Sequence, residues 1–267
     1  MSPKTLRVYE PFSVRDDRYA LAGLALNWHE YAPGLDQVES LQAYARVLEG
    51  KTHKVFRRKQ PQRYLPFMRR NKRMIIKDPI ACFSAEWLAQ HFDMGVLVMV
   101  RHPAAYVASL KRLIWNFNFQ NLLRQEQLMS DWLEPFREEM ERSNMDIIDS
   151  SSLFWKVMNT VLIGFAERNP EWRVCTNEDR SLEPAMCFRG LFDHFSLEWT
   201  PRVAAKIAEY SNRNNPVDPE EGVAHSMRRS SAENIDRWRK LLSPEESLRV
   251  REITKSVAGR FYDRDSW

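Results

Sequence analysis

Apolar runs alternate with helical spacings along this chain, and the alternation predicts strands that are each followed by a helix. A first apolar run, Leu6 to Tyr9, predicts a short strand. A second, Met74 to Ile76, predicts a buried strand, and the apolar spacing from Phe83 to Phe92 predicts the helix after it. Five consecutive apolar residues, Val96 to Val100, predict a strand that is buried on both faces.

The second half of the chain continues this alternation. Pro103 suits the first position of a helix, and the residues after it have helical spacing. A helix is predicted from Leu153 to Glu167, and a strand from Trp172 to Thr176. The sequence SPEE at 243–246 is a capping box that predicts a last helix ending near Arg260. The fold class is therefore α/β, with a parallel sheet flanked by helices.

Composition limits the classes of protein. The chain has 267 residues, of which 43% are hydrophobic and 28% charged, as in an ordinary globular protein, and we expect a single domain over 1–267. No window approaches the roughly 18 apolar residues of a membrane helix, so no membrane span is expected. Three cysteines and the absence of a charged-then-apolar leader favour a cytoplasmic location.

Charge and short motifs narrow the functions further. The stretch from Gly50 to Lys77 has eleven Lys or Arg and no Asp or Glu, which indicates an anionic partner or a solvated basic face. It matches no nucleic-acid-binding motif and lacks interleaved aromatics, so no nucleic acid is expected. The histidines and cysteines have no metal-ligand spacing, and we expect no metal. No Gly-x-x-x-x-Gly-Lys-Ser/Thr sequence of a P-loop kinase occurs.

Three polar residues follow the predicted strands at positions where open parallel sheets bind ligands. Arg101 follows one strand directly, and Ser109 lies eight residues later, about two turns into the helix. Lys77 has the equivalent place on the other strand. Together the three suit a polyanionic ligand. The alternatives are a solvated or carboxylate-paired Arg101, and a Ser109 hydroxyl bonded to its own helix.

Two segments in order, IIKDP and VLVMVRHPAAYVASLKRL, resemble the core of the sulfotransferases that use 3′-phosphoadenosine 5′-phosphosulfate. In that family an arginine at a strand end and a serine eight residues later bind the donor's 3′-phosphate, which Arg101 and Ser109 match. YEPF, NEDRSLEP and HSMRRSSAENIDRWRKLLSPEE resemble further segments of its carbohydrate-type and bacterial members. The resemblance implies a P-loop NTPase-like sulfotransferase fold, and transfer of a sulfuryl group to a hydroxyl or amine.

The resemblance also assigns roles. Lys77 corresponds to the lysine that neutralises the bridging oxygen as the nucleotide leaves, and otherwise is a surface lysine beside Asp78. Glu10 is the candidate base for the acceptor's proton, and otherwise bonds a neighbouring backbone N–H. His102, a weaker candidate base, otherwise caps the helix. At the C-terminal loop, RR at 228–229 makes Arg228 and Arg229 candidates for the 3′-phosphate.

One departure from the family pattern changes the expectation for activity. Family members begin with a strand and a Gly-x-x-Arg-Ser-Gly-Thr-like loop that holds the 5′-phosphosulfate, and this sequence has no such loop. We expect an N-terminally incomplete domain that lacks its first strand and is impaired as given. The alternatives are a non-catalytic nucleotide- or polyanion-binding module, another P-loop-like enzyme, or a nucleic-acid binder. The acceptor, whether carbohydrate, lipid or small molecule, and the oligomeric state stay open.

Overall fold

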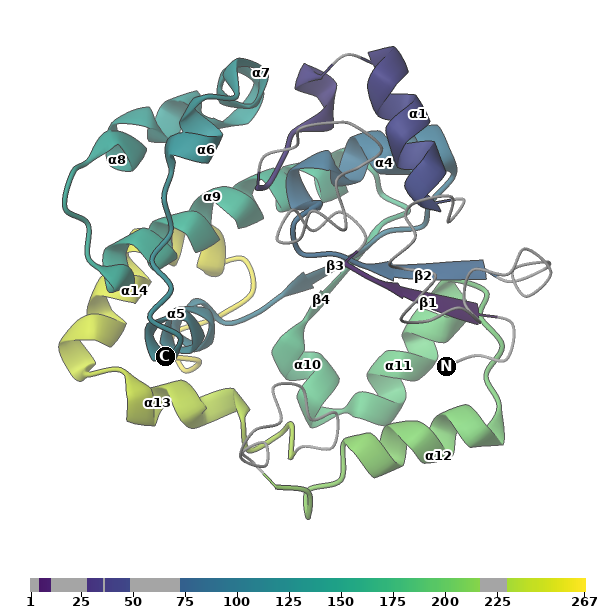
Figure 1. The fold of residues 1–267 in the computed structure, drawn as a ribbon. Helices are drawn as coiled ribbons and strands as arrows, with labels where there is room; N and C mark the ends of the chain where they lie inside the picture. The colour runs from purple at the N-terminus through teal and green to yellow at the C-terminus, as the bar shows by residue number, and fades with distance from the viewer. Residues whose placement is uncertain (1–4, 11–27, 36, 49–72, 217–229) are drawn as a thin grey trace. The chain divides into compact units, whose positions relative to one another are not determined.

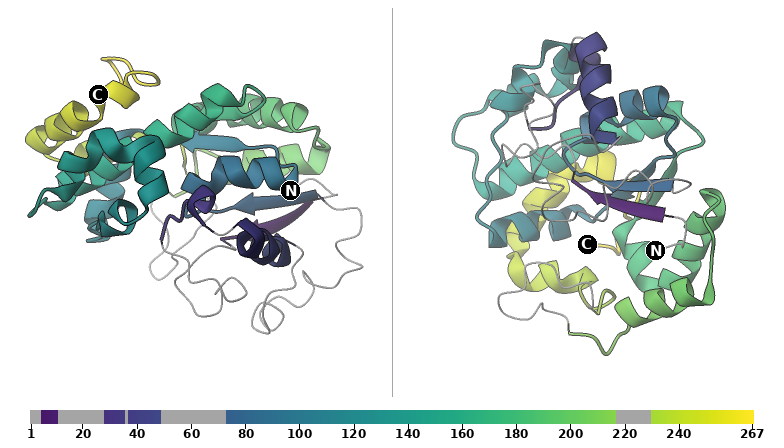
Figure 2. Two further views of the ribbon diagram at one scale, coloured as in Figure 1. Left: turned by 90° about the horizontal axis from the view of Figure 1, so that it is seen from above. Right: turned by 45° about the vertical axis from the view of Figure 1, so that its right-hand side comes forward.

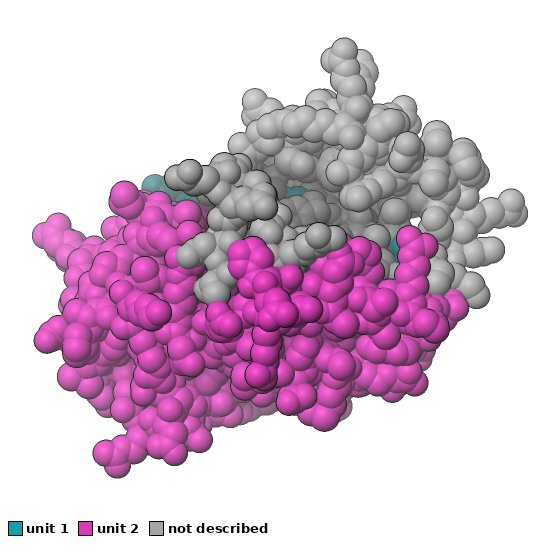
Figure 3. All heavy atoms as spheres, turned by 90° about the horizontal axis from the view of Figure 1, so that it is seen from below, with its two compact units in different colours: residues 1–94, 119–137 teal, residues 95–118, 138–267 magenta. Residues whose placement is uncertain are grey.

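A computed structural model of the chain describes residues 5–10, 28–35, 37–48, 73–216 and 230–267 (Figure 1). These residues are mostly helical, and their strands form two parallel pairs, which confirms the α/β class. They divide into two compact units, coloured in Figure 3: unit 1 holds 1–94 and 119–137, and unit 2 holds 95–118 and 138–267. Within the described ranges, none of the helices combines the length and apolar character needed to cross a membrane.

The strand pair of unit 1 confirms the first two predicted strands. β1 (Thr5–Tyr9) pairs in parallel with β2 (Arg73–Lys77), in a register that sets Thr5 opposite Arg73 and Tyr9 opposite Lys77. The prediction that the Met74–Ile76 strand is buried was wrong in degree, because its three apolar side chains are only half-buried. In the described part of unit 1, β2 has a single hydrogen-bonded neighbour, so its packing is incomplete.

The helices of unit 1 pack around a small aromatic core. Tyr44 and Trp87 are buried in it with ring centroids 5.3 Å apart, together with Ala32 and Leu88. The Ser84 hydroxyl accepts a hydrogen bond from the Ala32 N–H at 2.9 Å and donates one to a backbone carbonyl. The helical segments of the unit are η2 (Ala32–Gly34), α1 (Gln37–Leu48), η4 (Cys82–Ser84), α4 (Ala85–Phe92), α6 (Gln120–Leu123), α7 (Glu126–Leu128), the π-helical η5 (Met129–Leu133) and η6 (Glu134–Phe136). α8 (Arg137–Glu141) begins at the last residue of this unit.

The strand pair of unit 2 is packed on one face. β3 (Leu97–Val100) pairs in parallel with β4 (Arg173–Thr176), as predicted. The prediction that this strand is buried on both faces was wrong: Val98 and Val100 are buried, but Leu97 and Met99 are 36% and 41% exposed. Since successive side chains of a strand point to opposite faces, these two residues share the uncovered face of the pair.

A layer of three helices forms the core of unit 2. α5 (Pro103–Arg112), α9 (Ile147–Arg168) and α14 (Pro244–Ala258) contact one another and lie side by side (Figures 1 and 2). α9 begins six residues before the predicted start because the Asp146 carboxylate caps it by accepting the Asp149 N–H at 2.9 Å. The other helices of the unit are α10 (Asn177–Leu182), α11 (Pro184–His194), α12 (Pro201–Tyr210), η7 (Ile235–Arg237) and α13 (Trp238–Leu241).

Two predicted helix starts are confirmed in detail. Pro103 occupies the first turn of α5, where its missing N–H costs no hydrogen bond. At α14, Ser243 and Glu246 form the full capping box, each side chain accepting the other residue's backbone N–H. The α5 start matters for function because it directly follows the end of β3, which positions Arg101.

Candidate functional site

The two predicted catalytic residues lie together in unit 1. Glu10 directly follows β1 and Lys77 ends β2, so the parallel register sets them side by side. The Lys77 Nζ donates to Glu10 Oε1 at 2.6 Å, and the Glu10 N–H donates to the Lys77 carbonyl at 2.8 Å. Their side chains are 50% and 28% exposed. Glu10 thus pairs with Lys77 through its carboxylate, while Asp78 accepts the Ile80 N–H instead.

Glu10 has a strained backbone. Its φ of 44° lies in the left-handed region, which costs a non-glycine residue roughly 1–2 kcal/mol. Its N–H still completes the ladder to β2, so the strand pairing and the ion pair hold the residue in this conformation. Strain of this kind is common at functional sites, and the Glu10 carboxylate here pairs with Lys77 at the end of β2.

Arg101 lies in unit 2, directly after β3, as predicted. Its carbonyl accepts the Trp155 Nε1–H at 2.9 Å, which anchors the backbone at this point. Within the described ranges its guanidinium makes neither a hydrogen bond nor an ion pair. Part of the residue reaches the surface, while neighbouring atoms surround much of the guanidinium. Desolvation lowers the pKa of Arg101 most, and the charges of Arg112 and Arg180 lower it further, against the opposing effect of Glu178. An arginine remains charged despite such a shift.

These effects define a cluster of three arginines in unit 2, made by Arg101, Arg112 and Arg180. Ser109 and Arg112 are three residues apart on α5 and therefore share one face of it. The charge of Arg112, on this face, lowers the pKa of Arg101. In the described structure the Ser109 hydroxyl makes no hydrogen bond, so the alternative of a bond to its own helix is not found.

Glu178, in the first turn of α10, is the carboxylate whose charge raises the pKa of Arg101. Its Oε1 accepts the His102 N–H at 3.2 Å, and its Oε2 accepts the Tyr262 hydroxyl at 2.7 Å. Burial, followed by the adjacent Glu178 charge, raises the pKa of Tyr262, which keeps this hydroxyl a donor. Both carboxylate oxygens are thus engaged by other donors, and Glu178 forms no ion pair with the guanidinium.

His102 is a helix cap in an aromatic surround. Its Nδ1 accepts the Ala104 N–H at 3.2 Å, and its ring stacks on Trp238 at a centroid distance of 5.1 Å. Tyr262 and Trp267 meet the same ring edge-on. Burial lowers the pKa of His102 to about 4, so the imidazole is neutral near pH 7. The capping interpretation of His102 is confirmed.

The sequence predictions missed three members of this site: Arg112, Arg180 and Glu178. The signals were present, since Arg112 lies three residues after Ser109, and the other two belong to the NEDRSLEP stretch that follows β4. β4 ends beside β3 with Thr176 opposite Val100, so both strand ends open on the same edge of this pair. Arg180 also donates from Nη2 to Asn177 Oδ1 at 2.6 Å.

Some of the sequence predictions fall outside what the structure describes. Arg228 and Arg229, and residues 50–72 of the basic block, lie outside the described residues. The predicted convergence of Lys77 with Arg101 joins residues of different units and stays a prediction. The ranges that the structure describes contain no group of three or more His, Cys, Asp or Glu placed to hold a metal ion.

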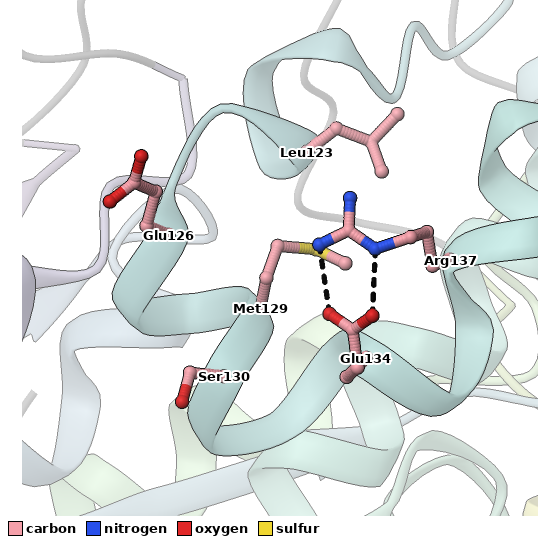
Figure 4. Close-up of a pocket in the computed structure, with 6 residues that line it drawn as sticks. All are labelled: Leu123, Glu126, Met129, Ser130, Glu134 and Arg137. Atoms are coloured by element: carbon pink, nitrogen blue, oxygen red, sulfur yellow. Dashed lines mark hydrogen bonds and ion pairs between the residues drawn. The ribbon is translucent and has the colours of Figure 1, made fainter.

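A cavity of about 580 Å³ lies in unit 1, and none of the predicted residues lines it (Figure 4). Arg137 donates two hydrogen bonds of 2.8 Å to Glu134 at its rim, which neutralises the charge of this guanidinium and lowers the pKa of Glu134. A guanidinium so paired is a poor anion site. The cavity is lined by Leu123, Glu126, Met129, Ser130, Glu134 and Arg137.

No family model matches this chain, and neither does any curated protein. A solved structure described as a sulfotransferase domain from the curacin biosynthetic pathway is similar, at 14% identity, covering 88% of this chain and 82% of that one with a TM-score of 0.44. At this identity and TM-score the likeness establishes neither a family nor an activity for this chain.

Proposed function

We propose that this chain is a sulfotransferase of the type that uses 3′-phosphoadenosine 5′-phosphosulfate, with Arg101 and Ser109 as the 3′-phosphate site. The observation that carries the proposal is the Arg101 guanidinium, which ends a parallel strand without an ion pair in the described structure. Arg112 and Arg180 add two positive charges to it.

The electrostatics of unit 2 favour a polyanion at this point. The charges of Arg112 and Arg180 disfavour the charged form of Arg101, and a phosphate bound at Arg101 would offset their repulsion. Arginine suits this ligand because its planar fork donates two hydrogen bonds to one phosphate. Each charge-assisted hydrogen bond contributes about 1.5–3 kcal/mol, so one such residue accounts for a 10- to 100-fold change in affinity.

The proposed chemistry is in-line transfer of the sulfuryl group to an acceptor hydroxyl or amine. Catalysis of this kind depends mainly on positioning and on charge stabilisation. Lys77 would neutralise the bridging oxygen as the nucleotide leaves, and Glu10 would take the acceptor's proton. Their observed ion pair supports these roles, since it sets a cation and a base at one strand end. An acceptor hydroxyl would replace Lys77 as the partner of Glu10.

A non-catalytic nucleotide-binding module is the second candidate. It is favoured by the sequence itself, in which no Gly-x-x-Arg-Ser-Gly-Thr-like loop occurs. Without such a loop the 3′-phosphate site would still hold the nucleotide, but the sulfuryl group would lack the positioning that provides about 7–11 kcal/mol of catalysis. The two candidates therefore predict the same binding and different turnover.

Two assays on the full chain separate them. Calorimetry measures binding of adenosine 3′,5′-bisphosphate, and a second assay measures its release from the phosphosulfate donor with carbohydrate, lipid and small-molecule acceptors. Binding with acceptor-dependent release supports the sulfotransferase. Binding without release supports the module, and absence of binding rejects both.

A further inference from the structure

Two of the three cysteines lie against each other in unit 2. Cys175 is on β4 and Cys187 is on α11, and their sulfur atoms are 3.3 Å apart, close enough for an S–H···S contact. Both residues are half-buried, so small reagents can reach them. Cys82, in unit 1, donates to the Pro79 carbonyl instead and serves as an internal comparison.

We propose that Cys175 and Cys187 form a redox-modification site, at which a small-molecule disulfide such as oxidised glutathione converts the two thiols to an intramolecular disulfide. A disulfide needs the sulfurs at about 2.0 Å, so they must approach by roughly 1.3 Å. The sulfur atoms are already 3.3 Å apart, so the movement required is small.

The exchange proceeds in two balanced steps. A thiolate of the pair attacks one sulfur of oxidised glutathione, which breaks its S–S bond, forms a mixed disulfide and releases one reduced glutathione. The second thiol gives up its proton, attacks the protein-side sulfur and releases another reduced glutathione. Two electrons pass from the thiols to the reagent. Burial raises the pKa of Cys175 to about 12, which keeps its sulfur mostly in the thiol form near neutral pH.

The position of the pair links it to the arginine cluster. The disulfide would close a loop from β4 through α10 to α11, and α10 carries Glu178 and Arg180. Asp179 and Arg180 already act on the pKa of Cys175, in opposite directions. Oxidation would therefore fix the segment that supports the charges around Arg101. Any effect on nucleotide affinity rests on the proposed function, but formation of the disulfide does not.

The test exposes the folded wild-type chain to glutathione buffers of increasing oxidised fraction, followed by alkylation and peptide mapping by mass spectrometry. The expected product is one disulfide joining Cys175 to Cys187, with Cys82 alkylated. The C82S variant should form the same disulfide, and C175S and C187S should form none. Because the bond closes a short loop, Tm should rise by about 5–10 °C in the oxidised protein.

Three alkylated cysteines at a large excess of oxidised glutathione would overturn the proposal, as would mixed disulfides alone or disulfides between chains. Calorimetry with adenosine 3′,5′-bisphosphate on the oxidised and reduced forms is a separate arm. If neither form binds while the disulfide still forms, the proposed function fails and the redox site stands.

Discussion

Lys77 and Arg101 both lie at the carboxyl ends of parallel strands, one in each unit, and they differ in how their charges are balanced. Lys77 is neutralised by Glu10 in an exposed pair of 2.6 Å. Arg101 makes no ion pair among the described residues, and both oxygens of Glu178 accept hydrogen bonds from other donors, the His102 N–H and the Tyr262 hydroxyl. A charge that the fold leaves unbalanced is the stronger indication of an anionic ligand.

The largest difference should appear in nucleotide affinity. Arg101→Ala should weaken binding of adenosine 3′,5′-bisphosphate about 10- to 100-fold, because a charge-assisted contact is lost. Lys77→Ala should change it less than about threefold, since its proposed partner develops charge only during transfer. Calorimetry measures both, with the exposed Arg142→Ala as a matched control for loss of charge. Equal losses of nucleotide affinity in Arg101→Ala and Lys77→Ala would contradict the different roles proposed for the two residues.

Acid should destabilise the protein through His102. Its pKa is about 4 when folded and about 6.5 when unfolded, so between these values the unfolded chain binds a proton that the folded chain does not. The contribution of neutral His102 to the free energy of unfolding is complete above pH 6.5. It decreases as pH falls toward 4, by about 3 kcal/mol in all. Urea unfolding across this range measures it.

The His102→Asn variant keeps a side-chain acceptor for the α5 cap and removes the titrating group. The slope of the unfolding free energy against pH should decrease in this variant, by up to the amount that corresponds to one bound proton. An unchanged slope in His102→Asn would contradict the burial argument.

Backbone strain at Glu10 can be tested apart from its charge. Glu10→Ala and Glu10→Gly both remove the carboxylate, but only glycine adopts a φ of 44° without steric cost. The glycine variant should therefore be more stable than the alanine variant by about 1 kcal/mol, measured as the free energy of unfolding in urea. Equal stability of the two variants would show that the chain relaxes at this position.

The smallest effect should be the stability contributed by the Glu10–Lys77 ion pair. Exposed pairs contribute about 0–1 kcal/mol, so Lys77→Met should lower the free energy of unfolding by less than about 1 kcal/mol. Denaturant titration at low and high salt measures this effect. High salt should reduce the difference in unfolding free energy between the wild type and the variant. A loss of several kcal/mol would mean that Lys77 is structural.

Periodicity and capping signals predicted β1 to β4 and the helices α4, α5, α9 and α14, and periodicity failed where it carries no information on packing. The run Val96 to Val100 is apolar at every position, so it could not show that Leu97 and Met99 lie on an uncovered face. The start of α9 was missed because buried serines at 150–152 interrupt the apolar spacing. Strand ends and helix caps were predictable because Pro103 and Ser243 act through local backbone chemistry.

For the site, the sequence predicted single residues better than their partners. Glu10 and Lys77 were each assigned a role, but their ion pair spans 67 residues and depends on the register of β1 and β2. Likewise, the hydrogen bond from Tyr262 to Glu178 joins residues 84 positions apart. This bond engages one oxygen of the carboxylate that acts on Arg101, and no local pattern contains it.

Selectivity for the 3′-phosphate tests the central claim most directly. Calorimetry of adenosine 3′,5′-bisphosphate and adenosine 5′-monophosphate, on the wild type and on Arg101→Ala, gives the ratio of the two dissociation constants in each. The proposed site predicts at least about tenfold tighter binding of the bisphosphate in the wild type, and a ratio near one in the variant. Equal affinity of the wild type for both nucleotides would contradict it.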